Sequence, residues 1–250
     1  MTKIAALGSI LAVGTRQVET ATVTGTCTGS GDYRCILTAT GMTGTPITTD
    51  VAILDEDTAD AVATKVCTAL NLVANITAWF KVEVSGPNII LTSILAAADD
   101  AAGAMNLDMN NQTSTGMDDV PTSANTTLGV AFVTTAQVEN IGGPSLSLDQ
   151  ADVTTHDSTG GWEESVITLI RSGEISLDII YDPNTATHAA TSGLVYRIEN
   201  KLISAIRITF PGPYLWYFDA YITGFTPNAS ASGAILATVS LKVTGQPVLV

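Results

Sequence analysis

Alternation of apolar and polar residues is the dominant pattern along the first half of the chain. In residues 20–27 every second position is Thr, and the positions between are Ala, Val, Gly and Cys. Residues 33–39 and 47–53 repeat the alternation, with a Gly-Met-Thr-Gly turn at 41–44 between them. A period of two places successive side chains on opposite faces of a strand. The pattern therefore predicts three strands, the first two joined as a hairpin through a turn at residues 29–32.

The period changes after residue 57. Apolar residues then recur three and four positions apart, as on one face of a helix, at Val62, Ala63, Val66, Ala69, Leu70 and Val73. Asp57 is the predicted N-cap, and the charge of Asp60 favours the first turn of the helix. Residues 80–84 and 88–95 predict two further strands around a Gly-Pro turn. A β-β-β-α-β-β order with short connections indicates a small α+β domain.

Strand patterns dominate again in the second half of the chain. They occur at residues 145–149, 174–181, 202–210, 214–225 and 235–243. Residues 188–200 carry a helical pattern instead. Roughly six or seven strands with one helix predict a β-sandwich or barrel. We expect the aromatic residues of 214–225 in its core, or with one face in the core and the other at a subunit interface.

The two patterns divide the chain into an interrupted domain and an inserted one. The α+β pattern ends in the polar stretch 121–127, whose composition is typical of a linker. We therefore predict a core domain made of residues 1–15 and 127–250, and an inserted domain made of residues 16–126. The inserted block contains 13 acidic and 4 basic residues, which indicates a solvated surface.

The composition indicates an oligomer and argues against a basic binding face. Only 14% of the 250 residues are charged, the net charge is −14, and the mean hydropathy is +0.32. A chain with 10 basic and 24 acidic residues does not grip phosphates or anionic membranes through a positive surface. The 37 threonines favour strands with one solvated face. A surface this poor in charge is better suited to subunit contacts than to a monomer.

No constellation of residues predicts catalysis or metal binding. His156 lies in Thr-Thr-His-Asp-Ser, but three adjacent residues cannot all face one reacting carbon, so we expect a turn histidine. His188 is the one other histidine. The acidic run 55–60 lacks the Gly and Glu positions of an EF-hand, and helix capping explains it better. We therefore predict no enzyme activity, no catalytic residue, no cofactor and no metal site.

Signals for a cellular compartment are weak. Cys27, Cys35 and Cys67 form neither a disulfide framework nor a zinc motif, so we expect buried thiols in a reducing compartment. Residues 4–14 could be read as the apolar region of a signal peptide or as a short N-terminal strand or arm. No apolar run reaches the roughly 18–20 residues that span a bilayer.

The stretch 139–183 carries a more specific pattern. Gly-Pro-Ser precedes a strand, Asp-Val-Thr-Thr-His-Asp-Ser and Gly-Gly-Trp follow it, and Gly-Glu-Ile-Ser opens the next strand. In these motifs the sequence resembles the major tail tube proteins of long-tailed, non-contractile bacteriophages such as lambda, over about residues 1–15 and 128–250. The residues that carry the resemblance are Gly143, Pro144, Ser145, Asp152, Thr154, Thr155, His156, Asp157, Ser158, Gly161, Trp162, Gly173 and Glu174.

The resemblance implies a structural virion protein. It implies a β-sandwich-like core with a flanking helix, six subunits in a ring, and rings stacked into a tube that conducts DNA during ejection. A long hairpin around residues 149–162 would reach the adjacent ring, with Trp162 anchoring that hairpin to the core. The tape-measure protein and then double-stranded DNA would occupy the lumen without sequence specificity. Tail terminator and tail-tip proteins would be further partners, and the tail would assemble in the cytoplasm of the host bacterium.

Two further expectations depend on this resemblance. Residues 16–126 would face outward, because a block of this size repeated around the inner wall would obstruct a duplex. The acidic balance of the chain predicts a net negative lumen that lets DNA slide. A secreted bacterial adhesin or surface-layer β-module is the alternative, supported by the Thr-rich strands and the possible signal peptide.

Overall fold

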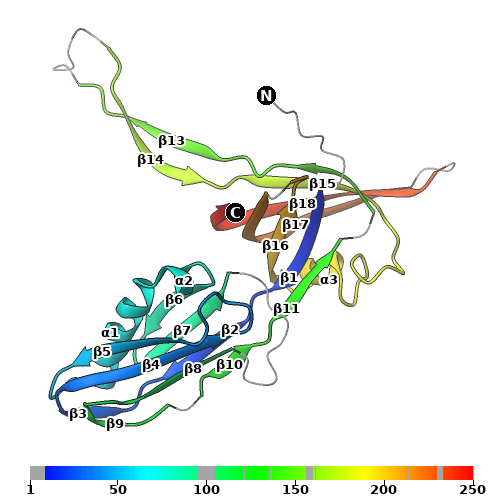
Figure 1. Cartoon of the computed structure of the whole chain (residues 1–250). Coiled ribbons are helices and arrows are strands. Elements are labelled where there is room, and N and C mark those ends of the chain that lie inside the picture. Colours follow the sequence, from blue (N-terminus) through cyan, green and yellow to red (C-terminus); the bar gives the residue numbers. More distant parts are fainter. Residues whose placement is uncertain are drawn as a thin grey trace. The chain divides into compact units, whose positions relative to one another are not determined.

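The computed structural model of the chain describes residues 9–94, 105–120, 122–135, 137–155, 160, 162–212, 214–229 and 233–249 (Figure 1). Two compact units make up the chain: unit 1 comprises Met1–Val13 and Val133–Val250, and unit 2 comprises Gly14–Phe132. The described residues form strands β1 to β18 and helices α1 to α3, so the predicted mainly β class is confirmed. Among these residues, no helix is long and apolar enough to cross a membrane.

Unit 1 is built on a seven-stranded sheet. In sheet order its strands are β11 (Val130–Thr134), β1 (Ile10–Thr15), β16 (Ile203–Thr209), β17 (Leu215–Ala229), β18 (Ile235–Leu249), β15 (Glu174–Ile180) and β12 (Val138–Gly142). Alternation selects the buried face: Ile175 and Leu177 are buried, while Glu174 and Ser176 are exposed. Leu177 lies opposite Val239 in the antiparallel register of β15 and β18, so both side chains enter the same core.

The aromatic residues of β17 are divided between core and surface. Phe218 and Tyr217 are buried on opposite faces of the strand, and Trp216 packs edge-on against Phe210. Tyr214 and Tyr221 remain exposed. The strand therefore supplies the core, as predicted, and also presents aromatic surface.

The helix predicted over residues 188–200 is shorter in the structure. Helix α3 spans only Leu194–Glu199, and turns occupy the preceding residues. His188 belongs to these turns: it is buried, its Nδ1 accepts a hydrogen bond from the backbone N–H of Asp182 (3.3 Å), and its ring stacks on Tyr181. Gly193, the N-cap of α3, passes so close to Thr187 that a Cβ would collide with the backbone there.

Unit 2 has its own core beneath helix α1 (Ala59–Asn71). One sheet has the order β10 (Ala124–Thr127), β2 (Val18–Thr22), β7 (Asn88–Ser93) and β6 (Phe80–Ser85), and a second has the order β5 (Ile47–Ile53), β4 (Gly31–Ala39) and β8 (Met105–Asn111). Helix α1 packs against β5, β6 and β7 through the apolar face that the sequence predicts. Helix α2 (Ala74–Thr77) follows it directly.

Two details of the predicted strand pairing in unit 2 are wrong. The alternating run 20–27 is not one strand: Gly25 has a φ of +93°, and a new strand, β3 (Gly25–Gly29), begins there. Strand β3 pairs with β9 (Thr115–Met117), whereas β4 pairs with β5 and β8, so the predicted hairpin through residues 29–32 does not form. Strands β8, β9 and β10 are additions to the predicted β-β-β-α-β-β order.

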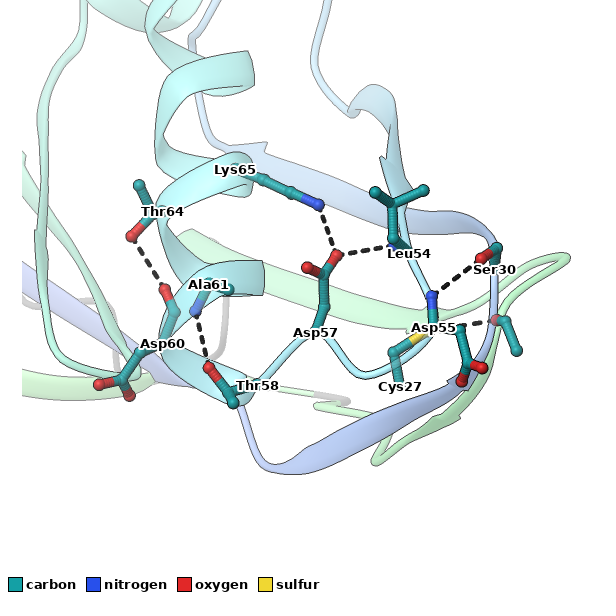
Figure 2. Close-up of polar contacts among 11 residues, drawn as sticks. Cys27, Ser30, Leu54, Asp55, Asp57, Thr58, Asp60, Ala61, Thr64 and Lys65 are labelled. Carbon is teal, nitrogen blue, oxygen red and sulfur yellow. Dashed lines mark hydrogen bonds and ion pairs between the residues drawn. The ribbon is translucent and has the colours of Figure 1, made fainter.

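The N-cap of α1 is Thr58, not Asp57 (Figure 2). The Thr58 hydroxyl accepts from the backbone N–H of Ala61 (3.4 Å). Asp57 instead holds the preceding loop, because its carboxylate accepts from the backbone N–H of Leu54 (2.7 Å) and from the ammonium group of Lys65. These bonds, the one from Leu54 above all, lower the pKa of Asp57 below its usual value. Within the acidic run, Asp57 thus orders the loop before α1, and Thr58 caps the helix.

The three cysteines are free and buried, as predicted. All lie in unit 2, where Cys27 is on β3, Cys35 on β4 and Cys67 on α1. Burial raises the pKa of the Cys35 thiol to about 12, with nearby Asp50 adding to the effect. A thiol with such a pKa carries almost no thiolate at neutral pH, so Cys35 is chemically inert in the folded chain.

Candidate assembly surface

Strands β13 (Ser147–Asp152) and β14 (Ser165–Arg171) form a hairpin that, among the residues the structure describes, pairs with no other strand. Figure 1 shows the two strands running side by side. Every residue of β14 is exposed, and Ile170 reaches 76% exposure. The apolar residues exposed along the hairpin are Leu148, Val153, Val166, Ile167, Leu169 and Ile170. A contiguous apolar surface of this kind is typical of a protein–protein contact.

Both faces of the hairpin are apolar. Leu148 lies opposite Ile170 in the antiparallel register, and Ile167 lies opposite Gln150 on the same side of β13. Val166 pairs with Ala151, which points to the other face. Exposed apolar side chains therefore lie on both faces of the hairpin.

An ion pair ties the two strands together near the base of the hairpin. The Arg171 guanidinium donates through Nε to both carboxylate oxygens of Asp149, at 2.8 and 2.7 Å. These bonds lower the pKa of Asp149 and raise that of Arg171. The Arg171 side chain is mostly in water and that of Asp149 about one-third exposed, so the pair contributes little to the free energy of unfolding.

Hydrogen bonds of Asp152 and Thr154 continue the pairing of the two strands beyond the ends of β13 and β14. Asp152 Oδ1 accepts from the backbone N–H of Thr154 (2.8 Å), and the bonds from Thr154 lower the pKa of Asp152. The Thr154 hydroxyl accepts from the backbone N–H of Glu164 (2.9 Å), and the N–H of Val153 donates to the Glu164 carbonyl (2.9 Å). The pairing thus continues beyond both strand ends and keeps the hairpin extended.

Residues from two separate predicted motifs meet at the base of the hairpin. A Cβ at Gly173 would collide with the backbone and hydroxyl of Ser145, and a Cβ at Gly143 would lie 2.6 Å from the Glu174 carbonyl oxygen. Both glycines also have positive φ, +64° and +98°. The Gly-Pro-Ser and Gly-Glu motifs therefore form one crossing, where the chain enters and leaves the hairpin. Pro144 lies between Gly143 and Ser145 at this crossing.

Trp162 does not pack on the core of the single chain. It is 78% exposed, so the expectation that it anchors the hairpin to the core is wrong for one chain alone. Gly160 has a φ of +74°, and a Cβ there would lie 3.2 Å from Trp162 Cδ1, so the glycine lets the indole ring lie against the backbone. Thr155 is exposed as well. His156, Asp157, Ser158 and Gly161 lie outside the described residues.

The exposed apolar residues of β14 and the Asp149–Arg171 pair were not among the predicted site residues. The run Ser-Val-Ile-Thr-Leu-Ile-Arg at 165–171 could have identified this surface, because its apolar residues are too dense for a strand with one face in water. Such a run predicts burial, but it does not say whether the same chain or another one covers it.

The second face of the seven-stranded sheet carries polar side chains along β12, β15 and β18. Asp178 is central to it, accepting from the Thr238 hydroxyl (3.0 Å) and from the Asn140 amide (3.3 Å). Lys242 pairs with Glu174 at 3.5 Å across β18 and β15. Acidic, basic and hydroxyl groups thus alternate over this face. Within the described part of the chain, no group of three or more His, Cys, Asp and Glu side chains is placed to hold a metal ion.

Comparison with known proteins gives one family match. The profile of the family described as lambda phage tail tube protein, TTP, matches residues 117–250, more than half of the chain and the whole of Val133–Val250. No curated protein matches the chain.

Three solved structures contain chains of low similarity. A chain in the virion of a native gene transfer agent particle is 18% identical, with 48% of this chain and 88% of that chain covered and a TM-score of 0.40. A chain in the tail of an empty gene transfer agent particle is 19% identical, with 48% of this chain and 86% of that chain covered and a TM-score of 0.39. A chain in the baseplate of the anti-feeding prophage is 11% identical, with 48% of this chain and 83% of that chain covered and a TM-score of 0.36.

Proposed function

The chain belongs to the lambda phage tail tube protein family, and from this premise we propose that six copies close into a ring and that the rings stack into a tube. Its role is that of a structural protein of the virion tail. The tube would conduct double-stranded DNA during ejection and would hold the tape-measure protein before that. Tail terminator and tail-tip proteins would bind its two ends, and assembly would take place in the host cytoplasm.

The hairpin β13–β14 is the observation that carries this proposal. It exposes apolar residues on both faces and is held extended by the Asp149–Arg171 pair and the bonds around Thr154. A monomer gains nothing from such a surface, whereas a stacked assembly can bury both faces between subunits. We propose that the predicted site residues between Gly143 and Glu174 form the contact between rings, and this geometry supports that role.

The two ends of the seven-stranded sheet also favour a closed ring. Strands β11 and β12 are its outermost strands, and each has neighbours on one side only. Unpaired strand edges invite pairing with another chain, and closure into a ring removes them. Ring closure through these strands therefore explains how an open sheet avoids indefinite aggregation.

We assign the polar face of this sheet to the lumen. Its opposite face is the apolar core of unit 1, so the polar face is the one suited to a water-filled channel. Asp178 and Glu174 contribute negative charge there, while Lys242 offsets part of it. A weakly negative, hydroxyl-rich wall would repel the DNA backbone enough to let the duplex slide.

We further propose that residues 16–126 form a decoration on the outside of the tube. Strands β2 and β10 lie side by side, so the entry and exit of this block are close together, as an insertion requires. Deleting residues 16–126 and joining the ends with a short Gly/Ser linker should give tubes of unchanged lumen and smaller outer diameter. Loss of folding after the deletion would show that the block is part of the core.

The proposal is tested with the purified full-length chain. Negative-stain microscopy and light scattering should show six-fold rings and tubes. Particles that remain monomeric at high concentration would contradict the proposed function.

A further inference from the structure

A pocket lies at the foot of the hairpin in unit 1. It has a volume of about 590 Å³, and its apolar lining comes from Leu146 and Ile170 of the hairpin base and from Pro247 and Leu249 of β18. Ser172 also lines it. Sites of about 300–1,000 Å³ with mostly apolar walls are large enough to enclose a drug-sized ligand, and an indole ring is smaller than that.

The same hairpin presents a side chain of matching chemistry at its other end. Trp162 is 78% exposed, and Trp is the residue type that contributes most often to the energetic centre of protein interfaces. An indole ring removes about 150–250 Å² from water when it is buried. An exposed Trp and an open apolar pocket are therefore complementary surfaces.

Trp162 cannot reach the pocket of its own chain. Eight residues separate it from Ile170, which corresponds to about 26 Å along an extended strand at about 3.3 Å per residue. The register of β13 and β14 and the bond between Thr154 and Glu164 keep this segment extended. A Trp162 side chain that fills this pocket therefore comes from a second copy of the chain.

We propose that Trp162 of one copy inserts into the pocket between Leu146, Ile170 and Leu249 of a copy in the adjacent ring. The inference rests on the proposed function and specifies its ring-to-ring contact. Donor and acceptor surfaces occupy different places on the chain, so the contact is head-to-tail, and it repeats at every ring boundary without self-termination.

Cysteine cross-linking tests the contact without removing either partner. A chain carrying Glu163→Cys and Gln246→Cys keeps Trp162 and the apolar lining residues, and replaces only Gln246 among the residues that line the pocket. Mild oxidation of assembled tubes should give a ladder of covalent multimers on a non-reducing gel. The matched control, Glu163→Cys with Leu54→Cys, places the second thiol at an exposed position of unit 2 and should give no ladder. The three native thiols are buried and should not contribute.

Assembly of Trp162→Ala is the second measurement. The critical concentration for tube formation should rise at least about thirty-fold, the effect of losing an interface hot spot, while single rings persist. Trp162→Phe should recover part of the loss. Leu72→Ala, which truncates an 82% exposed side chain in unit 2, should change nothing.

The outcomes separate the two levels of the proposal. A wild-type chain that forms no tubes contradicts the proposed function. Normal tubes from Trp162→Ala, or wild-type-like tubes of the cysteine pair without a ladder, overturn the pocket contact and leave the proposed function standing. Loss of the rings themselves in Trp162→Ala would place the contact inside a ring and overturn its assignment to the ring boundary.

Discussion

Strand β7 in unit 2 and strand β14 in unit 1 are both rich in Ile and Leu, and the structure treats them in opposite ways. In β7, Ile89 and Leu91 are buried under α1. In β14, Ile167 is 59% exposed and Ile170 is more exposed still. The difference lies in what surrounds each strand: β7 lies between β2 and β6 and contacts α1, whereas β14 pairs only with β13 within the described residues.

This contrast separates two uses of apolar surface. Unit 2 buries the apolar residues of β7 in its own core. The hairpin of unit 1 leaves its apolar residues for neighbours, so their free energy is realised only on assembly. Substitutions in unit 2 should therefore change folding, and substitutions in the hairpin should change assembly.

The largest effect is expected at the centre of unit 2. Phe80 is fully buried beneath α1, so Phe80→Ala should lower the free energy of unfolding of unit 2 by about 3–5 kcal/mol. Peptide-resolved hydrogen exchange reads the two units separately and should show faster exchange throughout unit 2. Leu72→Ala removes an exposed side chain and should cost less than about 0.5 kcal/mol. Equal effects of the two substitutions would contradict the assigned core.

The sequence predicts the buried elements of both units well, because their periods are regular. Helix α1 and strands β5, β15 and β18 follow directly from the spacing of their apolar residues. Strand β8 was missed although Met105, Leu107 and Met109 alternate with polar residues there and are buried. Strands β9 and β10 are short and mostly polar, and their pairing depends on the distant strands β3 and β2.

The candidate site was predicted less completely, for a physical reason. Gly143 and Gly173 were identified by motif, yet their meeting with Ser145 and Glu174 depends on tertiary structure. The exposure of Trp162 could not be foreseen either, since a Trp beside glycines is compatible with a loop packed on its own core or on another subunit. The spacing of apolar residues predicts that a side chain will be buried. It does not predict whether the same chain or a neighbouring subunit buries it.

The second effect concerns the crossing at the foot of the hairpin. Gly173→Ala adds a Cβ that collides with Ser145, whereas Gly245→Ala meets no atom within 4 Å, and both glycines have positive φ. Left-handed backbone alone should cost about 1–2 kcal/mol in each variant. Overpacking should add about 1–3 kcal/mol in Gly173→Ala only. Urea unfolding of the unassembled chains measures the difference, and equal losses would exclude the crossing as a tight contact.

A smaller effect is expected at the start of α1 in unit 2. Thr58→Ala removes the side chain that accepts from Ala61 and should cost about 1 kcal/mol. Asp60→Asn leaves this cap in place and should cost less than about 0.5 kcal/mol. Hydrogen exchange of the first turn of α1 is the measurement. A larger loss for Asp60→Asn would show that the dipole, and not the cap, holds this helix end.

The smallest effect on folding is expected in β14, and it tests the comparison most directly. Ile167→Ser should change the free energy of unfolding of the unassembled chain by no more than about 0.5 kcal/mol, because the side chain is exposed. The same substitution at buried Ile89 should cost at least about 2 kcal/mol. Urea unfolding at low protein concentration gives both free energies, and light scattering of the same samples at high concentration measures assembly.

Ile167→Ser should fold normally and assemble poorly, because the lost apolar surface matters only where a neighbour covers it. If Ile167→Ser unfolds like Ile89→Ser, the hairpin is covered by its own chain; if it assembles like the wild type, the apolar faces of β14 are not the assembly surface.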